Sequence, residues 1–397
     1  MEKQPNIEDI SKKISEDIQT RFDGETTATI AAESNIKDSV IFFTVEEMRK
    51  IPYNIRMFYW IFKNRYPEID NYIEQGTFLE IIHFLRNLCD QKREQHKCGA
   101  NFIICADEND INLSSTDSGV PVQLDDVQNP FSKNSGLAAA CKHTDTTKSF
   151  FMFRKSETNS KIEFRKLKDF SKNDTIINSM KNLCHRPNIG FSLESGSNSI
   201  RIFYDEDLRV EYFLSETTGS WTIRFKDDIL GLINSSHLNE NESIKLTNHV
   251  INLSYKGAGA MIIITKDASK FDKIASEHQN KMSLSLISPN TDNHFVDYAT
   301  NDGAVIIECK QFAIIRYVGI SISPTVNASD PYQGLLKKTL SGSRHEKAAQ
   351  YACENPDDYL IVVSENKTIS FLHGETPIYW RDEYVEPNYQ RESKEEK

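Results

Sequence analysis

Two short segments near the C-terminal end of the chain carry residue types that suit a nucleotide and a metal ion. Asp302 opens a hydrophobic strand with Gly303 and Ala304, and a carboxylate at a strand start can bind a divalent cation. Farther along, Arg344 follows a small-residue turn and opens an alanine-rich helix, where the helix dipole and a guanidinium favour phosphate. Together the two segments predict a combined nucleotide and metal site.

The helix start offers more than the guanidinium. Gly342 and Ser343 add backbone NH groups and a hydroxyl, and His345 follows Arg344 directly. Backbone NH groups at a helix N-terminus, together with an arginine, can bind the oxygens of a triphosphate. The alternative for this turn is ordinary N-capping of the helix by Ser343, with Arg344 in solvent.

Further residues at strand ends admit two interpretations each. Glu365 follows a Leu-Ile-Val-Val strand, where it is either a second metal ligand or a solvated turn residue. Gly259 and Ala260 begin an aliphatic strand, where they either shape the wall beneath a nucleotide base or serve packing alone. Asp302 with Gly303 also has the form of a tight turn that feeds a strand.

Length, charge and cysteine content limit the class of protein. The chain has 397 residues, which predicts two or three compact units with ample core. Its net charge of -11 argues against a nucleic-acid backbone or an anionic membrane as the main partner. The 7 cysteines are scattered without CxxC spacing, which indicates reduced thiols in the cytoplasm. No secretion signal is visible at the start, and the most apolar runs are short or interrupted by charges.

Hydrophobic patterning divides the chain into four parts and predicts an α+β or α/β fold. Residues 1–38 and 386–397 are polar and are expected to be flexible. Residues 39–240 are expected to be a sensor or regulatory region, in which an α/β unit precedes an antiparallel β meander. Residues 241–385 alternate helices and strands, which predicts a mixed sheet flanked by helices.

Two local predictions concern the first half of the chain. Phe78, Ile82 and Leu85 recur at helical spacing and predict an amphipathic helix. Three arginines within the meander are expected to lie on solvated strand faces rather than in a ligand site. These are Arg201, Arg209 and Arg224.

The C-terminal motifs resemble, in order and spacing, those of the diadenylate cyclase domain of bacteria and archaea. The same domain forms the N-terminal part of the DNA-integrity scanning protein. The resemblance covers roughly residues 244–374, and the first half of the chain carries no matching motif, so the ligand of that half is unknown. The matching motifs are Gly-Ala-Met-Ile-Ile-Ile at 259–264, Asp-Gly-Ala-Val-Ile-Ile at 302–307, Gly-Ser-Arg-His at 342–345 and Val-Val-Ser-Glu at 362–365.

This resemblance implies an activity and a set of site residues. In such cyclases two domains each hold one ATP face to face and condense them into cyclic di-AMP with release of two pyrophosphates. By resemblance, Asp302 would hold Mg²⁺ or Mn²⁺ near the attacking hydroxyl, with Glu365 as a second candidate ligand of the ion. Self-association through the C-terminal domain is implied as well. The nucleotide-binding residues implied are Gly259, Ala260, Gly303, Ala304, Gly342, Ser343, Arg344 and His345.

The chain departs from the family pattern at two positions. Asn301 stands where the family usually has a histidine, and Glu346 stands where it usually has a second arginine. An amide binds a metal ion less strongly than an imidazole, and a carboxylate repels phosphate. Two functions therefore stay open: a diadenylate cyclase, and a catalytically weak module that senses ATP or a cyclic dinucleotide. A third interpretation, an interaction scaffold that binds no nucleotide, would require all four motif matches to be coincidental.

Overall fold

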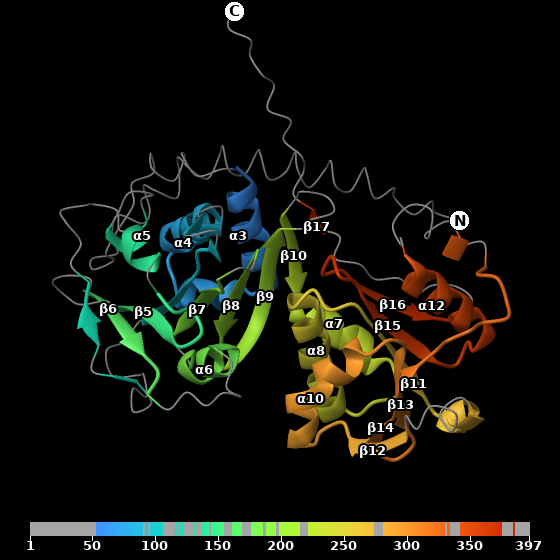
Figure 1. Ribbon diagram of the computed structural model, residues 1–397. Coiled ribbons are helices and arrows are strands. Elements are labelled where there is room, and N and C mark those ends of the chain that lie inside the picture. Colours follow the sequence, from blue (N-terminus) through green and yellow to red (C-terminus); the bar gives the residue numbers. More distant parts are fainter. Residues whose placement is uncertain are drawn as a thin grey trace, which may run out of the picture.

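The chain forms an α+β fold with two large β-sheets (Figure 1). The segments 1–38 and 386–397, which the sequence predicts to be flexible, lie outside the described residues. The computed structural model describes residues 53–89, 92–93, 96–105, 116–117, 119–122, 131, 136–142, 144–154, 161–168, 176–185, 188–195, 198–214, 221–273, 281–329, 332–333, 342–374 and 384–385.

The first half of the described chain supplies nearly all of the larger sheet. Its strand order is β17-β10-β9-β8-β7-β3-β5-β6-β4. Among these neighbours β3 and β5 run parallel, and the run from β7 to β10 is antiparallel, which confirms the predicted meander. The strands are β3 (Ala100–Cys105), β4 (Val120–Pro121), β5 (Ser149–Arg154), β6 (Lys161–Lys166), β7 (Ile189–Leu193), β8 (Ser199–Tyr204), β9 (Asp207–Leu214), β10 (Trp221–Phe225) and β17 (Tyr384–Val385); a separate hairpin joins β1 (Lys92–Arg93) and β2 (His96–Lys97).

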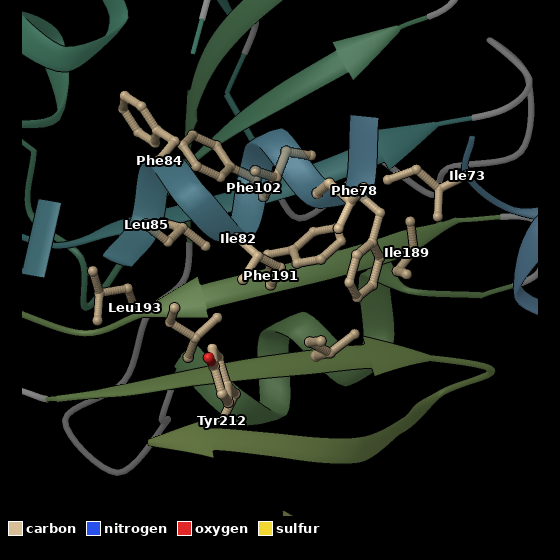
Figure 2. Packing of buried hydrophobic residues seen from close by; sticks show 14 of the residues in the cluster. Ile73, Phe78, Ile82, Phe84, Leu85, Phe102, Ile189, Phe191, Leu193 and Tyr212 are labelled. Atoms are coloured by element: carbon tan, nitrogen blue, oxygen red, sulfur yellow. The ribbon is translucent and has the colours of Figure 1, made fainter. Parts of the chain in front are cut away.

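An aromatic core lies between this sheet and helices on one of its faces. The predicted amphipathic helix is confirmed as α4, in which Phe78, Ile82 and Leu85 are buried. Figure 2 shows these side chains beside Phe191 of β7, and the Phe78 and Phe191 ring centroids are 5.5 Å apart. The elements before and within this layer are α3 (Tyr53–Arg65), η2 (Pro67–Asn71), α4 (Gln75–Cys89) and α5 (Gly136–Cys141).

The second half of the chain forms the smaller sheet, with strand order β12-β14-β13-β11-β15-β16. β11 and β13 run parallel, and the other neighbours are antiparallel. β11 is buried along its whole length, because side chains pack on both of its faces. The elements are β11 (Ala260–Thr265), η4 (Ala268–Phe271), β12 (Lys281–Ser285), β13 (Ala304–Cys309), β14 (Ala313–Ile320), α12 (Ser343–Glu354), β15 (Tyr359–Val363) and β16 (Ile369–His373).

A layer of helices fills the space between the two sheets (Figure 1). One buried cluster contains Phe203 from the larger sheet, Leu253 from α8 and Ile262 from the smaller sheet, so the two sheets share a core. Asn239 begins α8 through a capping box, in which it exchanges hydrogen bonds with Glu242 at 3.0 Å and 3.1 Å. The helices of this layer are α6 (Ile176–Leu183), α7 (Lys226–Asn234), α8 (Glu240–Tyr255) and α10 (Pro289–Thr300).

The prediction that the meander arginines lie on solvated faces is wrong for two of them. Arg201 and Arg224 are each 2 % exposed, because α8 and a turn of the smaller sheet cover the face of the sheet on which they lie. Glu211 lies between them on the middle strand and pairs with both, at 2.9 Å and 2.8 Å. The two guanidinium charges are therefore buried around one carboxylate.

A buried histidine in the helical layer gives the fold an expected acid sensitivity. His249 of α8 stacks on Phe295, and burial lowers the pKa of His249 from 6.5 to about 4, although Asp292 opposes the shift. The folded state favours the neutral ring of His249. The contribution of this ring to the stability of the fold is therefore complete above about pH 6.5, and it is lost as the pH falls toward 4. Between neutral pH and about pH 5 we expect the wild type to lose about 2 kcal/mol more than H249Q.

Urea unfolding at the two pH values measures this difference. H294Q is the matched control, since His294 lies on the neighbouring helix and its side chain is exposed. An equal loss of stability in wild type and H249Q would contradict the assignment.

Candidate functional site

The starts of two parallel strands meet at one end of the smaller sheet. Met261 of β11 pairs with Ala304 of β13. Gly259 and Asp302 each stand two residues before this pair, so they come level with each other at neighbouring strand starts. The Asp302 side chain is exposed, and its residue precedes the start of β13 at the same end of the sheet as Gly259. Two of the predicted motifs are thereby brought together.

The antiparallel strand β15 brings Glu365 to the same end. Val363, the last residue of β15, pairs with Ala260, the first residue of β11. Glu365 follows two residues later, in the turn to β16, and its side chain is exposed. This register joins a third motif to the strand starts.

Arg344 completes the group from the outer helix. Its Nη1 atom lies 3.3 Å from Oε1 of Glu365. A Cβ atom built on Gly259 would lie 2.9 Å from the Cζ atom of Arg344, so the guanidinium rests directly on this glycine. A larger residue at position 259 would displace the guanidinium. The four motifs thus lie at one end of the sheet, where Arg344 rests on Gly259 and Asp302 precedes the neighbouring parallel strand.

The first turn of α12 lies at this end of the sheet. Its N-cap is Gly342, at φ 113°, which has no side chain that could cap the helix. Ser343 is the first helical residue and is exposed, so the alternative of N-capping by Ser343 does not describe this helix. Uncapped NH groups beside a guanidinium are suited to bind an anion.

The glycine at position 303 is required by the local packing of the backbone. Its φ is 117°, and a Cβ atom there would lie 2.5 Å from the carbonyl carbon of Gly319 and 2.7 Å from the nitrogen of Ile320. The close approach that requires a glycine is therefore made by the end of β14. Ala304 and Ala260 are buried at the first positions of their strands.

His345 lies inside the domain rather than at the surface. Its ring is 5 % exposed, and Nε2 lies 3.2 Å from Oγ of Ser370 and 3.4 Å from Oγ of Ser364. These serines stand on either side of the turn that carries Glu365. The histidine therefore holds the helix start against that turn, a role that the sequence motif alone does not indicate.

The carboxylates suit a metal ion that arrives with a nucleotide. Asp302 and Glu365 lie at the same end of the sheet, but the described residues contain no group of three or more His, Cys, Asp or Glu side chains that could hold an ion. Mg²⁺ commonly binds one or two carboxylates together with substrate phosphates rather than an all-protein cage. The donor set therefore fits an ion held jointly by Asp302 and a triphosphate.

Replacing Gly259 tests the packing of Arg344. We expect G259A to fold normally, because the guanidinium can swing away, and to bind ATP about tenfold more weakly, since a hydrogen bond to a charged group is worth about 1.5 kcal/mol or more. Equilibrium dialysis against ATP measures the affinity. G231A is the matched control, because a Cβ at this helical glycine meets nothing within 4 Å. Equal ATP affinity in G259A and G231A would contradict this role of Gly259.

Comparison with known proteins gives weak structural similarity. No protein-family model matches the chain. No curated protein matches it either. A hypothetical membrane spanning protein from Bacillus cereus is 20% identical over 34% of this chain, with a TM-score of 0.25, and this chain spans 61% of its length. DacA from Staphylococcus aureus is 23% identical over 39% of this chain and 89% of its own, with a TM-score of 0.22.

A search of the helices in the described part of the chain finds none that is both long and apolar enough to cross a membrane.

Proposed function

We propose that the protein is a metal-dependent diadenylate cyclase that condenses two ATP molecules into cyclic di-AMP. The observation that supports this most is the position of Arg344 on Gly259, beside the strand start that carries Asp302. A guanidinium, an open helix start and a carboxylate at one end of a sheet suit the triphosphate and the ion that such a reaction needs.

The protein residues have separate tasks in this reaction. Arg344 and the NH groups of the first turn of α12 bind the triphosphate and orient it. Asp302 would hold the divalent ion, which would neutralise phosphate charge and increase the acidity of the attacking hydroxyl. Each 3′-oxygen forms a bond to the α-phosphorus of the opposing ATP as the bond from that phosphorus to pyrophosphate breaks. Each hydroxyl proton leaves to solvent, and two pyrophosphates are released.

A single domain cannot complete this reaction, because each ATP reacts with a nucleotide held by another domain. Two copies of the smaller sheet would face each other through the end that carries Asp302 and Arg344. Such pairing converts a reaction between two free nucleotides into one between oriented neighbours. Activity per molecule should therefore rise with protein concentration until pairing is complete.

A sensing module is the second candidate, and two carboxylates favour it. Glu365 already pairs with the guanidinium, and Glu346 is exposed in the first turn of α12, where it would repel a phosphate. A site with these charges could bind a nucleotide without turning it over.

Incubation of the full chain with ATP and Mg²⁺ or Mn²⁺ separates the candidates. Mass spectrometry of the products, at several protein concentrations, should find a cyclic dinucleotide and pyrophosphate if the protein is a cyclase. Binding of ATP without product would favour the sensing module. If the protein neither binds ATP nor forms product, both candidate functions are rejected.

A further inference from the structure

The buried arginines of the larger sheet lie on three neighbouring strands. Arg201 of β8 and Arg224 of β10 each stand opposite Glu211 of β9, and all three are at most 3 % exposed. Buried charges of this kind need satisfied hydrogen bonds. Arg201 donates from Nε to Oε1 of Glu211, and its guanidinium also lies over the ring of Tyr255, 3.1 Å from the centroid, while its buried Nη2 has no hydrogen-bond partner among the described residues. Arg224 has further partners.

Arg224 reaches out of its own sheet. Its Nη1 donates to Oγ of Ser254 at 2.7 Å, in the last turn of α8. Its Nη2 donates to the backbone carbonyl of Lys367 at 2.5 Å, and Ser254 donates to the same carbonyl. Lys367 lies in the turn between β15 and β16. One side chain of the larger sheet therefore holds a turn of the smaller sheet.

That turn carries Glu365. It closes through hydrogen bonds of 2.9 Å between Ser364 and Thr368 and between Lys367 and Ser364. A Cβ atom on Gly257 would lie 3.1 Å from the carbonyl oxygen of Glu365, so the loop after α8 packs tightly against the turn. The Glu365 carboxylate then pairs with Arg344 in the candidate site.

The pair of Glu365 and Arg344 does not hold itself in place. Their side chains are 77% and 41% exposed, and an exposed ion pair contributes little to its own geometry. The position of the carboxylate is set by the backbone of the turn, and the turn is held from the buried side by Arg224. The chain of contacts runs from Glu211 through Arg224, the Lys367 carbonyl and Glu365 to Arg344.

We propose that Arg224 is a positioning residue through which the larger sheet sets the orientation of the phosphate-binding Arg344. It acts through the turn between β15 and β16 and touches no substrate. The inference rests on the proposed function only for what Arg344 binds. A change in the larger sheet that shifts Arg224 would move Glu365 and alter nucleotide binding at the other sheet, which gives the sensor region a direct route to the site.

The first arm of the test measures the mechanical link without any nucleotide. R224K keeps a positive charge beside Glu211 but cannot reach Glu211, Ser254 and the Lys367 carbonyl together. Amide hydrogen exchange in the turn at 364–368 should then be at least about tenfold faster than in wild type. R201K is the matched control, because Arg201 is equally buried on the same carboxylate and its guanidinium contacts Glu211 and Tyr255. Its turn should exchange at the wild-type rate.

If R224K does not fold, S254A serves in its place. Ser254 is fully buried and donates to the same Lys367 carbonyl, while the charges around Glu211 stay intact. Unchanged exchange in the turn of the folded variant, or an equal increase in R201K, would overturn the proposal.

The second arm measures the effect on the nucleotide site. R224K should weaken ATP binding about two- to fivefold, as expected for loss of an orienting contact on an exposed pair, and should raise KM more than it lowers kcat. E365Q should give a similar loss, and the double variant R224K/E365Q should be no worse than either single one. Additive losses in the double variant, or wild-type affinity in R224K, would overturn the route through Glu365.

The two arms separate this inference from the proposed function. If the wild type binds no ATP and makes no product, the proposed function fails, and the exchange result still decides whether Arg224 positions the turn. If the wild type is active and the turn exchanges normally in the variants, the positioning role alone is rejected.

Discussion

D302N is expected to lower formation of the cyclic dinucleotide by about 100- to 1,000-fold while the fold stays intact. The amide has almost the same shape as the carboxylate but lacks the charge that holds a divalent ion. Because Asp302 is exposed at a strand start, the substitution leaves no buried group without a partner.

Product formation at saturating ATP and metal ion measures this effect, and circular dichroism checks the fold. D297N is the matched control, because it makes the same change at an exposed carboxylate of α10, a few residues earlier in the chain. If D302N forms product at the rate of D297N, Asp302 has no role in the reaction.

E211Q is expected to lower the free energy of unfolding by about 3 to 5 kcal/mol, since it leaves two buried guanidinium groups without a countercharge. Burial alone would raise the pKa of Glu211, but the charges of Arg201 and Arg224 outweigh it and hold the pKa below its ordinary value. The ionised carboxylate therefore stabilises the fold above the unfolded pKa, and this contribution is lost as the pH falls through the folded pKa.

Urea unfolding of the wild type and E211Q at neutral pH measures the loss, and the gap between them should shrink at strongly acid pH. E206Q is the matched control, because Glu206 is exposed and pairs only at the surface with His185. Its loss should stay below about 1 kcal/mol. Equal stability of E211Q and E206Q would show that the buried charges are satisfied in another way.

The regular elements of the smaller sheet could be predicted from local sequence. Aliphatic runs bounded by turn residues, such as the one at 262–264, favour buried strands, and the structure places them in β11, β13 and β15. The alanines of α12 pack on that sheet, as an alanine-rich helix with polar residues on its other face should. Local patterning is enough for these elements because burial on two faces leaves a continuous apolar run.

The pairing of the strands could not be predicted in the same way. The parallel register of Met261 with Ala304, which brings Gly259 level with Asp302, joins segments about forty residues apart, and local periodicity carries no information on such contacts. The close approach of Gly303 to β14 could not be predicted either, because it also depends on how distant segments pair. The sequence motifs predicted which residues would matter but not how the sheet assembles them.

The buried arginines show a different limit. Arg201 alternates with Ile200 and Ile202, a pattern typical of a strand with one apolar and one solvated face. The polar face is instead covered by α8 and by the turn that contains Lys367. A charged residue within a strand therefore does not identify a solvated face when another part of the chain supplies both cover and hydrogen-bond partners.

Photolabelling with an azido derivative of ATP tests most directly whether the end of the smaller sheet is the nucleotide site. After irradiation of the full chain with the probe and Mg²⁺, peptide mass spectrometry locates the modified residues. We predict labels in the peptides that contain Gly259, Asp302 or Arg344, and loss of these labels when unlabelled ATP is added. Labels that ATP displaces only from the first 240 residues would contradict the account.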